Sequence, residues 1–368
     1  MKTVLQICQN YHQPFLDCTR QYAALFKNSP YRVVTVFLCG PEDAAVRKEA
    51  DADEVIFLEH HRDELDGLKT HIIRELQALS KQYQFEVCIA HRNKPTYLAL
   101  ISTRLPVISV HHAFGDFDRL GRRLLARVFN KRLTILAVSN AVRDEIRARL
   151  PFLSEDRVFT LYNRVNASFL RSQLLSRNEA REQLSLPRDA FVIANVGRLH
   201  PDKDQATLIR GFSLALKELP ENSRLVIIGT GKSETKLRTL IAELDLNEQV
   251  ILTGHVKEAR KLFRAFDLFV LSSDHEPFGM VLLEAMAAEI PVIASDCGGA
   301  CEVVEGVGRL FEMGSAENLS KAILDTLEPV TDSEELALRS RQQLEKFSDE
   351  AVREFFWSHP RIQQLLKG

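Results

Sequence analysis

The stretch SSDHEPFGMVLLEAMAAEIPVIASDCGG, residues Ser272–Gly299, decides the fold. An apolar strand is expected to end at the two serines, a polar loop holds Asp274, His275 and Glu276, and a helix rich in small residues begins near Gly279. A second apolar run and a glycine pair follow this helix. Strand, loop, helix and strand in this order indicate one βαβ unit of a parallel sheet.

Similar units extend along the chain in both directions. The strand segments of these units are too apolar for a sheet that has one face in water. They therefore predict parallel sheets covered by helices on both faces. In the first half of the chain the predicted strands are Thr3–Ile7, Val33–Leu38, Glu54–Leu58, Phe85–Ala90, Val107–Val110, Ile135–Ser139 and Val158–Tyr162. In the second half they are Phe191–Gly197, Arg224–Gly229, Gln249–Gly254, Leu268–Ser272 and Pro291–Ser295.

Helical patterns separate these strands at Leu65–Tyr83, Gln205–Leu219, Glu234–Leu244, Glu258–Phe266 and Gly279–Glu289. The polar, arginine-rich segment Arg164–Asp189 interrupts the alternation and is predicted to be a linker. The tail Thr331–Gly368 is predicted to be helical, and it contains the only tryptophan, Trp357. We therefore predict an α/β protein with two doubly wound, Rossmann-like domains that face each other across a cleft. The predicted domains are residues 1–166 and 167–346, with a helix at 347–368 that packs back on the first domain.

Composition excludes several classes of protein. The 368 residues are 45% hydrophobic and 27% charged, which is typical of globular chains that fold in water. Lys and Arg number 48 against 50 Asp and Glu, so no overall basic field favours nucleic acid, and no such partner is expected. The start, MKTVLQICQN, lacks the features of a signal peptide, and no apolar run is long enough to span a bilayer. A cytoplasmic location is expected.

The six cysteines lie mostly in apolar runs, where a free thiol behaves as a small hydrophobic side chain. Cys297 and Cys301 have no histidine or second cysteine pair nearby, so they do not predict a zinc site. Two acidic clusters, Asp51-Ala52-Asp53 and Asp274-His275-Glu276, also lack the ligands that would support a metal ion. No metal site is predicted.

The start of the helix near Gly279 is suited to phosphate. Unpaired amides and the positive end of the helix dipole attract phosphate oxygens there, and a glycine permits close approach. Glu284, one turn into the helix, would accept hydrogen bonds from a ribose diol. Glu276, in the loop before the helix, would face the part of the ligand on the other side of the phosphate. Acidic residues at helix starts are also common without a ligand. One glutamate on each side of a phosphate suggests a nucleotide sugar.

A second loop, within VGRLHPDKD, supplies cations. Gly197 ends a predicted strand, and Arg198 and Lys203 follow it on the way into the next helix. These two side chains would bracket a diphosphate, Arg by a forked contact and Lys as a point charge, and would stabilise it as a leaving group. The alternative is that both are solvated surface residues. Asp202 and Asp204 are interpreted as capping residues of that helix.

The glutamate pair of EPFGMVLLE, followed by EAMA, PVIAS and GG, resembles the donor-site signature of the large retaining glycosyltransferase family 4, which has the GT-B fold. VGRLHPDKD, VIIGTGKSETKL, VILTGHV, AVSNAV and LYNRVN also stand in the order found in that family. The resemblance is to enzymes of bacterial cell-surface glycans and lipopolysaccharide cores. It implies that the first domain binds the acceptor and the second the nucleotide-sugar donor, expected to be a UDP- or GDP-sugar, with no other cofactor.

The resemblance also assigns residues. The donor-diphosphate pair of the family falls on Arg198 and Lys203, and its histidine that contacts the donor sugar matches His111 better than its neighbour His112. The catalytic set implied is therefore His111, Glu276, Arg198 and Lys203. The donor-binding set is Gly197, Arg198, Lys203, Gly229, His255, Val256, Glu276, Phe278, Gly279, Met280 and Glu284. Family members hold the base largely with backbone groups near His255, so the base cannot be inferred from side chains.

Two positions depart from the family pattern. The loop Gln9–Phe15 lacks the glycine pair that many members have after the first strand, so no ligand contact is assigned to it. Glu289 occupies a turn position where glycine is usual. His91 and Arg92, at another strand end of the first domain, are weaker candidates for the acceptor side.

The segment Arg119–Arg149 has nine Arg and Lys residues against two acidic ones. Leucines and other apolar residues lie among them at helical spacing, so this segment is expected to contact an anionic membrane or a phosphorylated glycolipid. A solvated basic face on a packed helix explains the same pattern.

The sequence therefore predicts a metal-independent, retaining hexosyltransferase that extends a glycan or glycolipid acceptor in lipopolysaccharide or other cell-surface polysaccharide synthesis, in the cytoplasm or at the inner face of the membrane. Two alternatives remain open. One is another GT-B enzyme, a sugar-nucleotide epimerase or a phosphorylase, and the other is a non-catalytic subunit that binds a nucleotide sugar.

Overall fold

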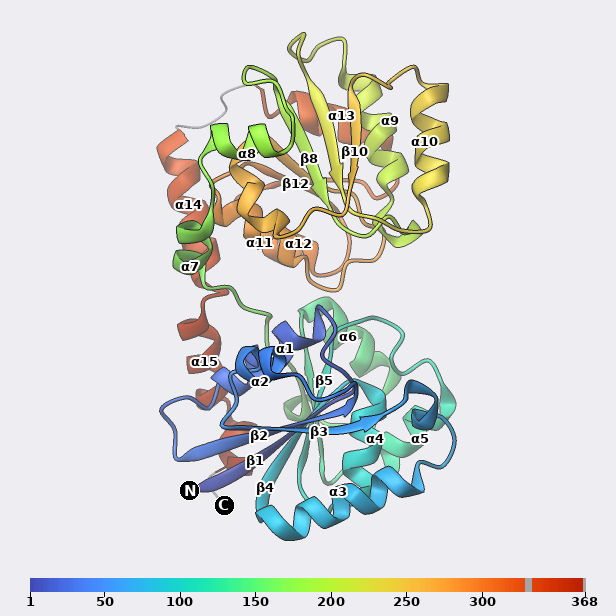
Figure 1. Cartoon of the computed structure of the whole chain (residues 1–368), viewed down its shortest axis with the longest axis vertical. Coiled ribbons are helices and arrows are strands. Elements are labelled where there is room, and N and C mark those ends of the chain that lie inside the picture. Colours follow the sequence, from blue (N-terminus) through green and yellow to red (C-terminus); the bar gives the residue numbers. More distant parts are fainter. Residues whose placement is uncertain (328–332, 367–368) are drawn as a thin grey trace. The chain divides into compact units, whose positions relative to one another are not determined.

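The computed structural model describes residues 1–327 and 333–366 (Figure 1). The chain forms two compact units, unit 1 from Met1–Asn163 with Val352–Gly368, and unit 2 from Arg164–Ala351. Residues 331, 332, 367 and 368 of the predicted helical tail lie outside the described residues. Among the residues that are described, no helix has the length and apolar character needed to cross a bilayer.

Unit 1 contains a parallel sheet of seven strands in the order β3-β2-β1-β4-β5-β6-β7. The sheet starts at β1 in its interior and grows toward both edges, which is the doubly wound arrangement. Strands β1, β2, β4, β5 and β6 are almost wholly buried, as the apolar runs predicted. The strand bounds are β1 Lys2–Cys8, β2 Tyr31–Cys39, β3 Glu54–His60, β4 Phe85–His91, β5 Val107–His111, β6 Leu133–Ala137 and β7 Val158–Thr160.

Helices connect these strands and cover both faces of the sheet (Figure 1). The predicted helix Leu65–Tyr83 is wrong at its start, because Gly67 and Lys69 both have positive φ and helix α3 begins only at Thr70. Leu65 belongs instead to a short 3-10 helix. The bounds are α1 Phe15–Ala24, α2 Ala44–Glu49, η1 Arg62–Leu65, α3 Thr70–Tyr83, α4 Asn93–Ser102, α5 Leu120–Val128, α6 Asn140–Arg149 and η2 Glu155–Arg157.

Unit 2 contains a second parallel sheet, in the order β10-β9-β8-β11-β12-β13. Its last strand was not predicted, because it has only three residues and includes the polar Arg309 and the exposed Leu310. The two sheets confirm the predicted fold class of two doubly wound α/β domains. The strand bounds are β8 Val192–Val196, β9 Arg224–Ile228, β10 Val250–Gly254, β11 Leu268–Leu271, β12 Val292–Ser295 and β13 Arg309–Phe311.

The helices of unit 2 include four that the sequence did not predict, α7, α8, α12 and α13. Segment Arg164–Asp189 is not an unstructured linker, because Asn166 and Ser176 cap two short helices there, α7 and α8. Arg181 of α8 is 1% exposed and donates to the carboxylate of Asp267 at 2.8 Å and to backbone carbonyls. The bounds are α7 Ala167–Gln173, α8 Arg177–Gln183, η3 Pro201–Lys203, α9 Gln205–Ala215, α10 Glu234–Glu243, η4 Ala259–Ala265, α11 Met280–Ala287, α12 Ala300–Val304, α13 Ala316–Leu324 and α14 Ser333–Glu345.

The end of the chain contributes to the core of unit 1 through α15 (Asp349–Ser358) and α16 (Pro360–Leu366). Phe356 is fully buried in this core, and its ring centroid lies 5.7 Å from that of Phe26. The indole N–H of Trp357 donates to the carbonyl of Leu25 at 2.9 Å. Apolar side chains from the last turns of the chain therefore complete a cluster built on the first strands.

We predict that Phe356→Ala lowers the free energy of unfolding of unit 1 by about 3 to 5 kcal/mol, because a fully buried ring leaves a cavity. Phe355→Ala is the matched control, since Phe355 lies on the same helix and is 47% exposed. It should cost less than about 1 kcal/mol. Urea unfolding followed by the fluorescence of Trp357 measures both. Equal losses in the two variants would contradict the packing described.

Candidate active site

Two loops of unit 2 are joined at the carboxyl ends of the neighbouring strands β8 and β11. The backbone N–H of Asp274 donates to the carbonyl of Asp202 at 3.0 Å, and the hydroxyl of Ser272 donates to the carbonyl of Lys203 at 2.9 Å. The loop after β8 and the loop after β11 are therefore one connected surface. Sequence reasoning placed both loops at this edge but assigned no role to Ser272.

An ion pair lies at the junction of these loops. The Nζ atom of Lys203 is 2.6 Å from Oε2 of Glu276, and the two side chains are only 19% and 10% exposed. Ser273 donates its hydroxyl to the same carboxylate oxygen at 3.2 Å. A lysine ammonium has three donors, so this contact leaves capacity for an oxygen of a ligand. Two residues predicted separately from sequence therefore meet in one constellation.

Helix α11 begins beside this pair. Gly279 is its N-cap in a left-handed conformation with φ 98°, and the amide of Phe278 points to Oε1 of Glu276 at 3.5 Å. The ring of Phe278 is buried, whereas Met280 and Glu284 on the first two turns are half-buried. The amide of Leu282 donates to the carbonyl of the N-cap Gly279 at 2.9 Å, whereas the amides before it have no carbonyl one turn earlier within the helix, so this end of α11 is suited to an anion.

A close backbone approach explains Gly299, the second glycine of the pair that ends the stretch Ser272–Gly299. A Cβ atom on Gly299 would lie 2.3 Å from the carbonyl oxygen of Pro277 and 2.8 Å from Cα of Phe278. The amide of Gly299 also donates to the carbonyl of Glu276 at 2.9 Å. This position therefore holds the loop before α11, a role that sequence reasoning did not assign.

Arg198 differs from Lys203 in its surroundings. Its side chain is 73% exposed, and its nearest acidic group in the described residues is Asp202, at 3.6 Å. Its carbonyl accepts a hydrogen bond from Gln205 at 3.0 Å, so the backbone is fixed while the guanidinium extends into solvent. The predicted capping role is confirmed for Asp204, which accepts from the amide of Thr207. Asp202 instead contacts the ring of His200 at 2.5 Å.

The remaining predicted donor residues follow β8, β9 and β10. Gly229 has φ 146°, and a Cβ there would lie 1.9 Å from the carbonyl oxygen of Gly197. Its amide donates to the carbonyl of Gly254 at 2.9 Å, so a tight turn that requires glycine joins the three strand ends. Open space surrounds the Cβ position of Gly197. His255 is exposed and Val256 is half-buried just after β10.

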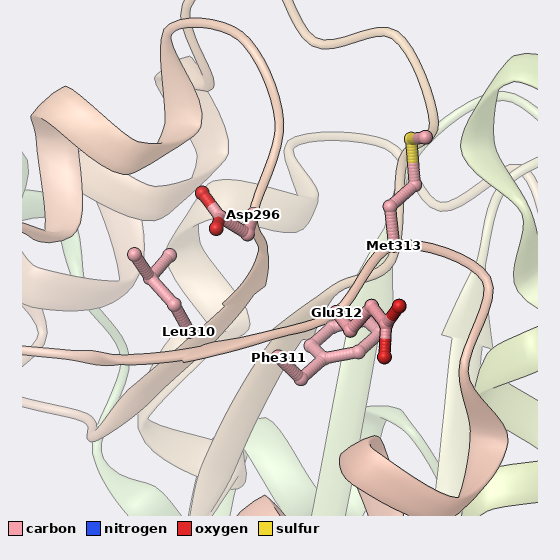
Figure 2. Close-up of a pocket in the computed structure, with 5 residues that line it drawn as sticks. All are labelled: Asp296, Leu310, Phe311, Glu312 and Met313. Carbon is pink, nitrogen blue, oxygen red and sulfur yellow. The ribbon is translucent and has the colours of Figure 1, made fainter.

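A shallow hollow of about 360 Å³ lies beyond the ends of β12 and β13 (Figure 2). None of the predicted donor residues lines it. Asp296 follows β12 directly, and Glu312 and Met313 follow β13, so the hollow is at the same carboxyl edge of the sheet as the loops described above. Its lining residues are Asp296, Leu310, Phe311, Glu312 and Met313.

In unit 1, His111 is fully buried at the end of β5. Its Nδ1 atom is 2.6 Å from Oδ2 of Asp116, and its Nε2 atom is 2.8 Å from the hydroxyl of Ser109. Burial alone would raise the pKa of Asp116, but the bond to His111 and nearby positive charge outweigh it and hold that pKa below its usual value. Both ring nitrogens of His111 are therefore occupied within unit 1, and the ring is not presented to a ligand.

The neighbouring His112 is half-buried. Its Nε2 atom lies 3.5 Å from Nδ1 of His91, and its Nδ1 atom lies 3.8 Å from Sγ of Cys18. Burial, together with the charges of His111 and Arg92, lowers the pKa of His112 to about 4. Burial also lowers the pKa of His91 well below its usual value. Both rings are thus neutral near pH 7, and of the two histidines at this strand end His112 is the one that retains exposed surface.

The two departures from the family pattern have structural explanations. In the loop without glycine, the Tyr11 hydroxyl donates to the carbonyl of Pro41 at 2.9 Å, and its ring packs on Phe37 and Phe57. Glu289 has φ 61°, in the left-handed region that favours glycine, and its carboxylate pairs with Arg341 at 2.8 Å. Arg92 also has a positive φ, 70°, and its guanidinium lies over the ring of Phe15.

Several basic side chains of the segment Arg119–Arg149 make contacts within the fold and are not free surface charges. Arg132 donates to three backbone carbonyls and Arg147 to two, so both serve the fold. Arg149 pairs with Asp118 at 2.9 Å. Of the basic side chains in and around helix α5, Arg119, Arg127 and Lys131 are exposed.

Comparison with known proteins gives the class of this protein. A family model described as "Glycosyl transferases group 1" matches residues 176–343, and one described as "Glycosyltransferase Family 4" matches residues 26–169. The two models together cover most of both units, and the paired α/β domains match the GT-B fold of that family. The chain belongs to glycosyltransferase family 4.

The individual relatives are similar to this chain over only part of their length. An uncharacterised glycosyltransferase of Methanocaldococcus jannaschii is 32% identical over 46% of this chain and 44% of its own length. The lipopolysaccharide core biosynthesis glycosyltransferase LpsD of Rhizobium meliloti is 35% identical over 47% of this chain and 50% of its own length. The chain thus spans about half the length of the curated relatives it matches.

Among solved structures, a glycosyltransferase of Rickettsia africae has a TM-score of 0.84 at 18% identity and covers 100% of this chain and 99% of that one. HepE of Anabaena in complex with UDP-glucose has a TM-score of 0.74 at 20% identity, covering 100% and 99%. At these identities the likeness concerns the fold.

We predict that His112→Gln weakens the pH dependence of stability in unit 1. The unfolded chain takes up a proton on His112 near 6.5 and the folded chain only near about 4, so stability is present above the first value and is lost as the pH falls toward the second. Between about pH 7 and pH 5, wild type should lose about 2 kcal/mol more than the variant.

Urea unfolding with Trp357 fluorescence at several pH values measures this difference. Between about pH 7 and pH 8 the two proteins should behave alike, which serves as the internal control. Parallel losses down to about pH 5 would show that His112 takes up its proton equally in both states.

Proposed function

We propose that this protein is a retaining glycosyltransferase that moves a sugar from a nucleotide-sugar donor to a glycan or glycolipid acceptor. The observation that supports the proposal is the Lys203–Glu276 pair, held beside the start of α11 by the joined loops of β8 and β11. A cation, a carboxylate and a helix N-terminus at one strand edge suit the three parts of such a donor: diphosphate, sugar hydroxyls and nucleoside.

In this proposal the diphosphate lies against the first amides of α11 and Lys203. Arg198 moves from solvent onto the outer phosphate oxygens, which its exposed side chain allows. Glu276 hydrogen-bonds hydroxyls of the donor sugar, and Glu284 those of the ribose. Backbone groups around Gly229 and His255 hold the base. A UDP- or GDP-sugar fits this plan equally well, and HepE of Anabaena, which shares the fold, has been solved with UDP-glucose.

The mechanism follows from where charge develops. As the glycosidic bond to the diphosphate breaks, negative charge grows on the leaving oxygens, and Lys203, Arg198 and the helix amides stabilise it. Three positive groups of this kind make a divalent ion unnecessary on electrostatic grounds. No side chain is assigned as a covalent nucleophile. The acceptor is therefore proposed to attack the donor sugar on the same face from which the diphosphate leaves.

On the acceptor side we place the end of β5 in unit 1. His111 fixes Asp116 and the strand end, and His112 offers a neutral ring to a hydroxyl. His111 is then a positioning residue, and the sugar contact that the family resemblance implied for it falls to His112. This assignment follows from burial, because His111 has no exposed surface.

Helix α5 supports a peripheral contact with an anionic membrane at the inner face. Leu120, Leu124 and Val128 are 75%, 63% and 66% exposed and recur every four residues, so they form one apolar stripe. Exposed Arg119, Arg127 and Lys131 lie around the same helix. An apolar stripe with flanking cations is suited to a lipid interface or to a phosphorylated glycolipid. Synthesis of lipopolysaccharide or another cell-surface polysaccharide is the proposed role.

We predict that Lys203→Ala and Glu276→Ala each lower kcat/KM for sugar transfer by about 100-fold or more, because each removes a group that acts on the departing diphosphate or the donor sugar. The assay follows release of nucleotide and the transferred sugar with a panel of nucleotide sugars and glycolipid acceptors. Lys236→Ala, an exposed lysine on α10, is the control and should leave turnover unchanged.

Near-wild-type turnover in both folded variants would overturn the assignment of the site. The products separate the alternatives, since an epimerase changes the donor without an acceptor and a phosphorylase needs free phosphate. A non-catalytic subunit would raise its thermal midpoint with a donor and release no product.

We predict that charge reversal at Arg119, Arg127 and Lys131 lowers binding to anionic liposomes by about 100-fold or more, since each cation near such a surface contributes about 1 kcal/mol. Leu124→Ser should also weaken binding, because it interrupts the apolar stripe. Leu68→Glu is the control, since Leu68 is 80% exposed in unit 1 but lies outside α5. Flotation with vesicles of phosphatidylglycerol measures the bound fraction, and equal fractions for all proteins would exclude α5 as the membrane contact.

A further inference from the structure

Three side chains with metal-ligating atoms meet at the end of β3 in unit 1. Within the described residues, one ligand atom each from His60, Glu64 and His71 lies within 4.8 Å of the other two. Oε2 of Glu64 is 3.4 Å from Nδ1 of His60 and 3.2 Å from Nε2 of His71. Nitrogen and oxygen ligands bound to zinc at tetrahedral positions are about 3.3 Å apart, so two edges of the group have zinc-like lengths without any rearrangement.

The carboxylate of Glu64 is held in this orientation. Its Oε1 atom accepts the backbone N–H of His61 at 2.8 Å, which leaves Oε2 facing the two imidazole rings. The carboxylate is therefore positioned before any cation arrives.

The ring of His60 is oriented from its other side. Its Nε2 atom lies 2.8 Å from Oε2 of Glu75 in helix α3, and the His60 side chain is only 10% exposed. A histidine that binds a metal through one nitrogen commonly donates the other N–H to a carboxylate, which fixes its tautomer and raises its basicity. With Nε2 protonated toward Glu75, Nδ1 of His60 carries the lone pair, and this atom lies 3.4 Å from Oε2 of Glu64.

We propose that His60, Glu64 and His71 bind a zinc ion, with Glu75 as the carboxylate that orients His60. Two imidazole nitrogens and one carboxylate oxygen are a ligand set that zinc accepts, and the fourth position is left for water. His71 and Glu64 are 46% and 41% exposed, so the ion can enter from solvent. This site is separate from the metal-independent transfer proposed above, because its ligands all belong to the β3–α3 connection.

The ion would join three elements of unit 1 through one ligand from each. His60 ends β3, Glu64 lies in η1 and His71 lies in the first turn of α3. Helix α3 starts from Lys69, which has a left-handed conformation and provides no side-chain cap. Leu68, beside it, is 80% exposed. Zinc would therefore order residues 61–70 at the carboxyl edge of the sheet in unit 1.

The test uses the full-length protein without a histidine tag. Equilibration with zinc sulfate followed by gel filtration and metal analysis should give one zinc per chain. His60→Ala and His71→Ala should each weaken zinc binding by about 100-fold, and Glu75→Gln by about 10-fold, the range seen when outer carboxylates are removed. His61→Ala is the matched control, because it keeps the backbone N–H that holds Glu64, and its affinity should stay within about twofold of wild type.

Two measurements on wild type remove the dependence on variants that fold poorly. Cobalt bound in place of zinc should give visible absorption without the near-ultraviolet band of a thiolate ligand, and zinc should slow amide hydrogen exchange within residues 61–70. Absence of zinc from wild type, a thiolate band, or binding unchanged in both His60→Ala and His71→Ala would overturn the proposal. In each of those cases the cluster is a set of histidine–glutamate contacts without a metal ion, and the proposed transferase function is unaffected.

Discussion

The buried ion pair of Lys203 and Glu276 is the interaction on which the candidate site depends. It connects the loops after β8 and β11, and a second bond from Ser272 to the carbonyl of Lys203 locks the same junction. Removing two charges from water is costly, and it is offset here by the short contact, the hydroxyl of Ser273 and the start of α11. A pair of this kind fixes geometry more than it adds stability.

The same principle organises unit 1, where His111 is a structural partner of Asp116. A histidine at the carboxyl end of a strand is expected to face a ligand, but this ring is enclosed by its own loop. The neighbouring His112 retains some exposed surface and has a neutral ring. In both units, therefore, a buried polar pair at a strand end holds the loop that a ligand is proposed to contact. In unit 2 the pair itself supplies the contacting groups, whereas in unit 1 the contact falls to the neighbouring His112.

Strand positions were predictable because a parallel sheet covered on both faces needs continuous apolar runs, and β1, β2 and β8 are such runs. Elements without that signature were missed. Strand β13 is three residues long, and α7 and α8 lie in a segment whose arginines suggest solvent. Arg181 is nevertheless buried, since Asp267 and several carbonyls satisfy its donors.

The sequence by itself determined the two α/β domains, the family and the identity of the residues at the strand ends, because these depend on local apolar periodicity and on motifs of fixed spacing. Only the tertiary structure decided which of those residues meet. Lys203 and Glu276 are far apart in the chain, and the neighbours His111 and His112 differ in burial and in the partners of their rings. Pairing and burial arise from contacts between distant segments, which local patterns do not specify.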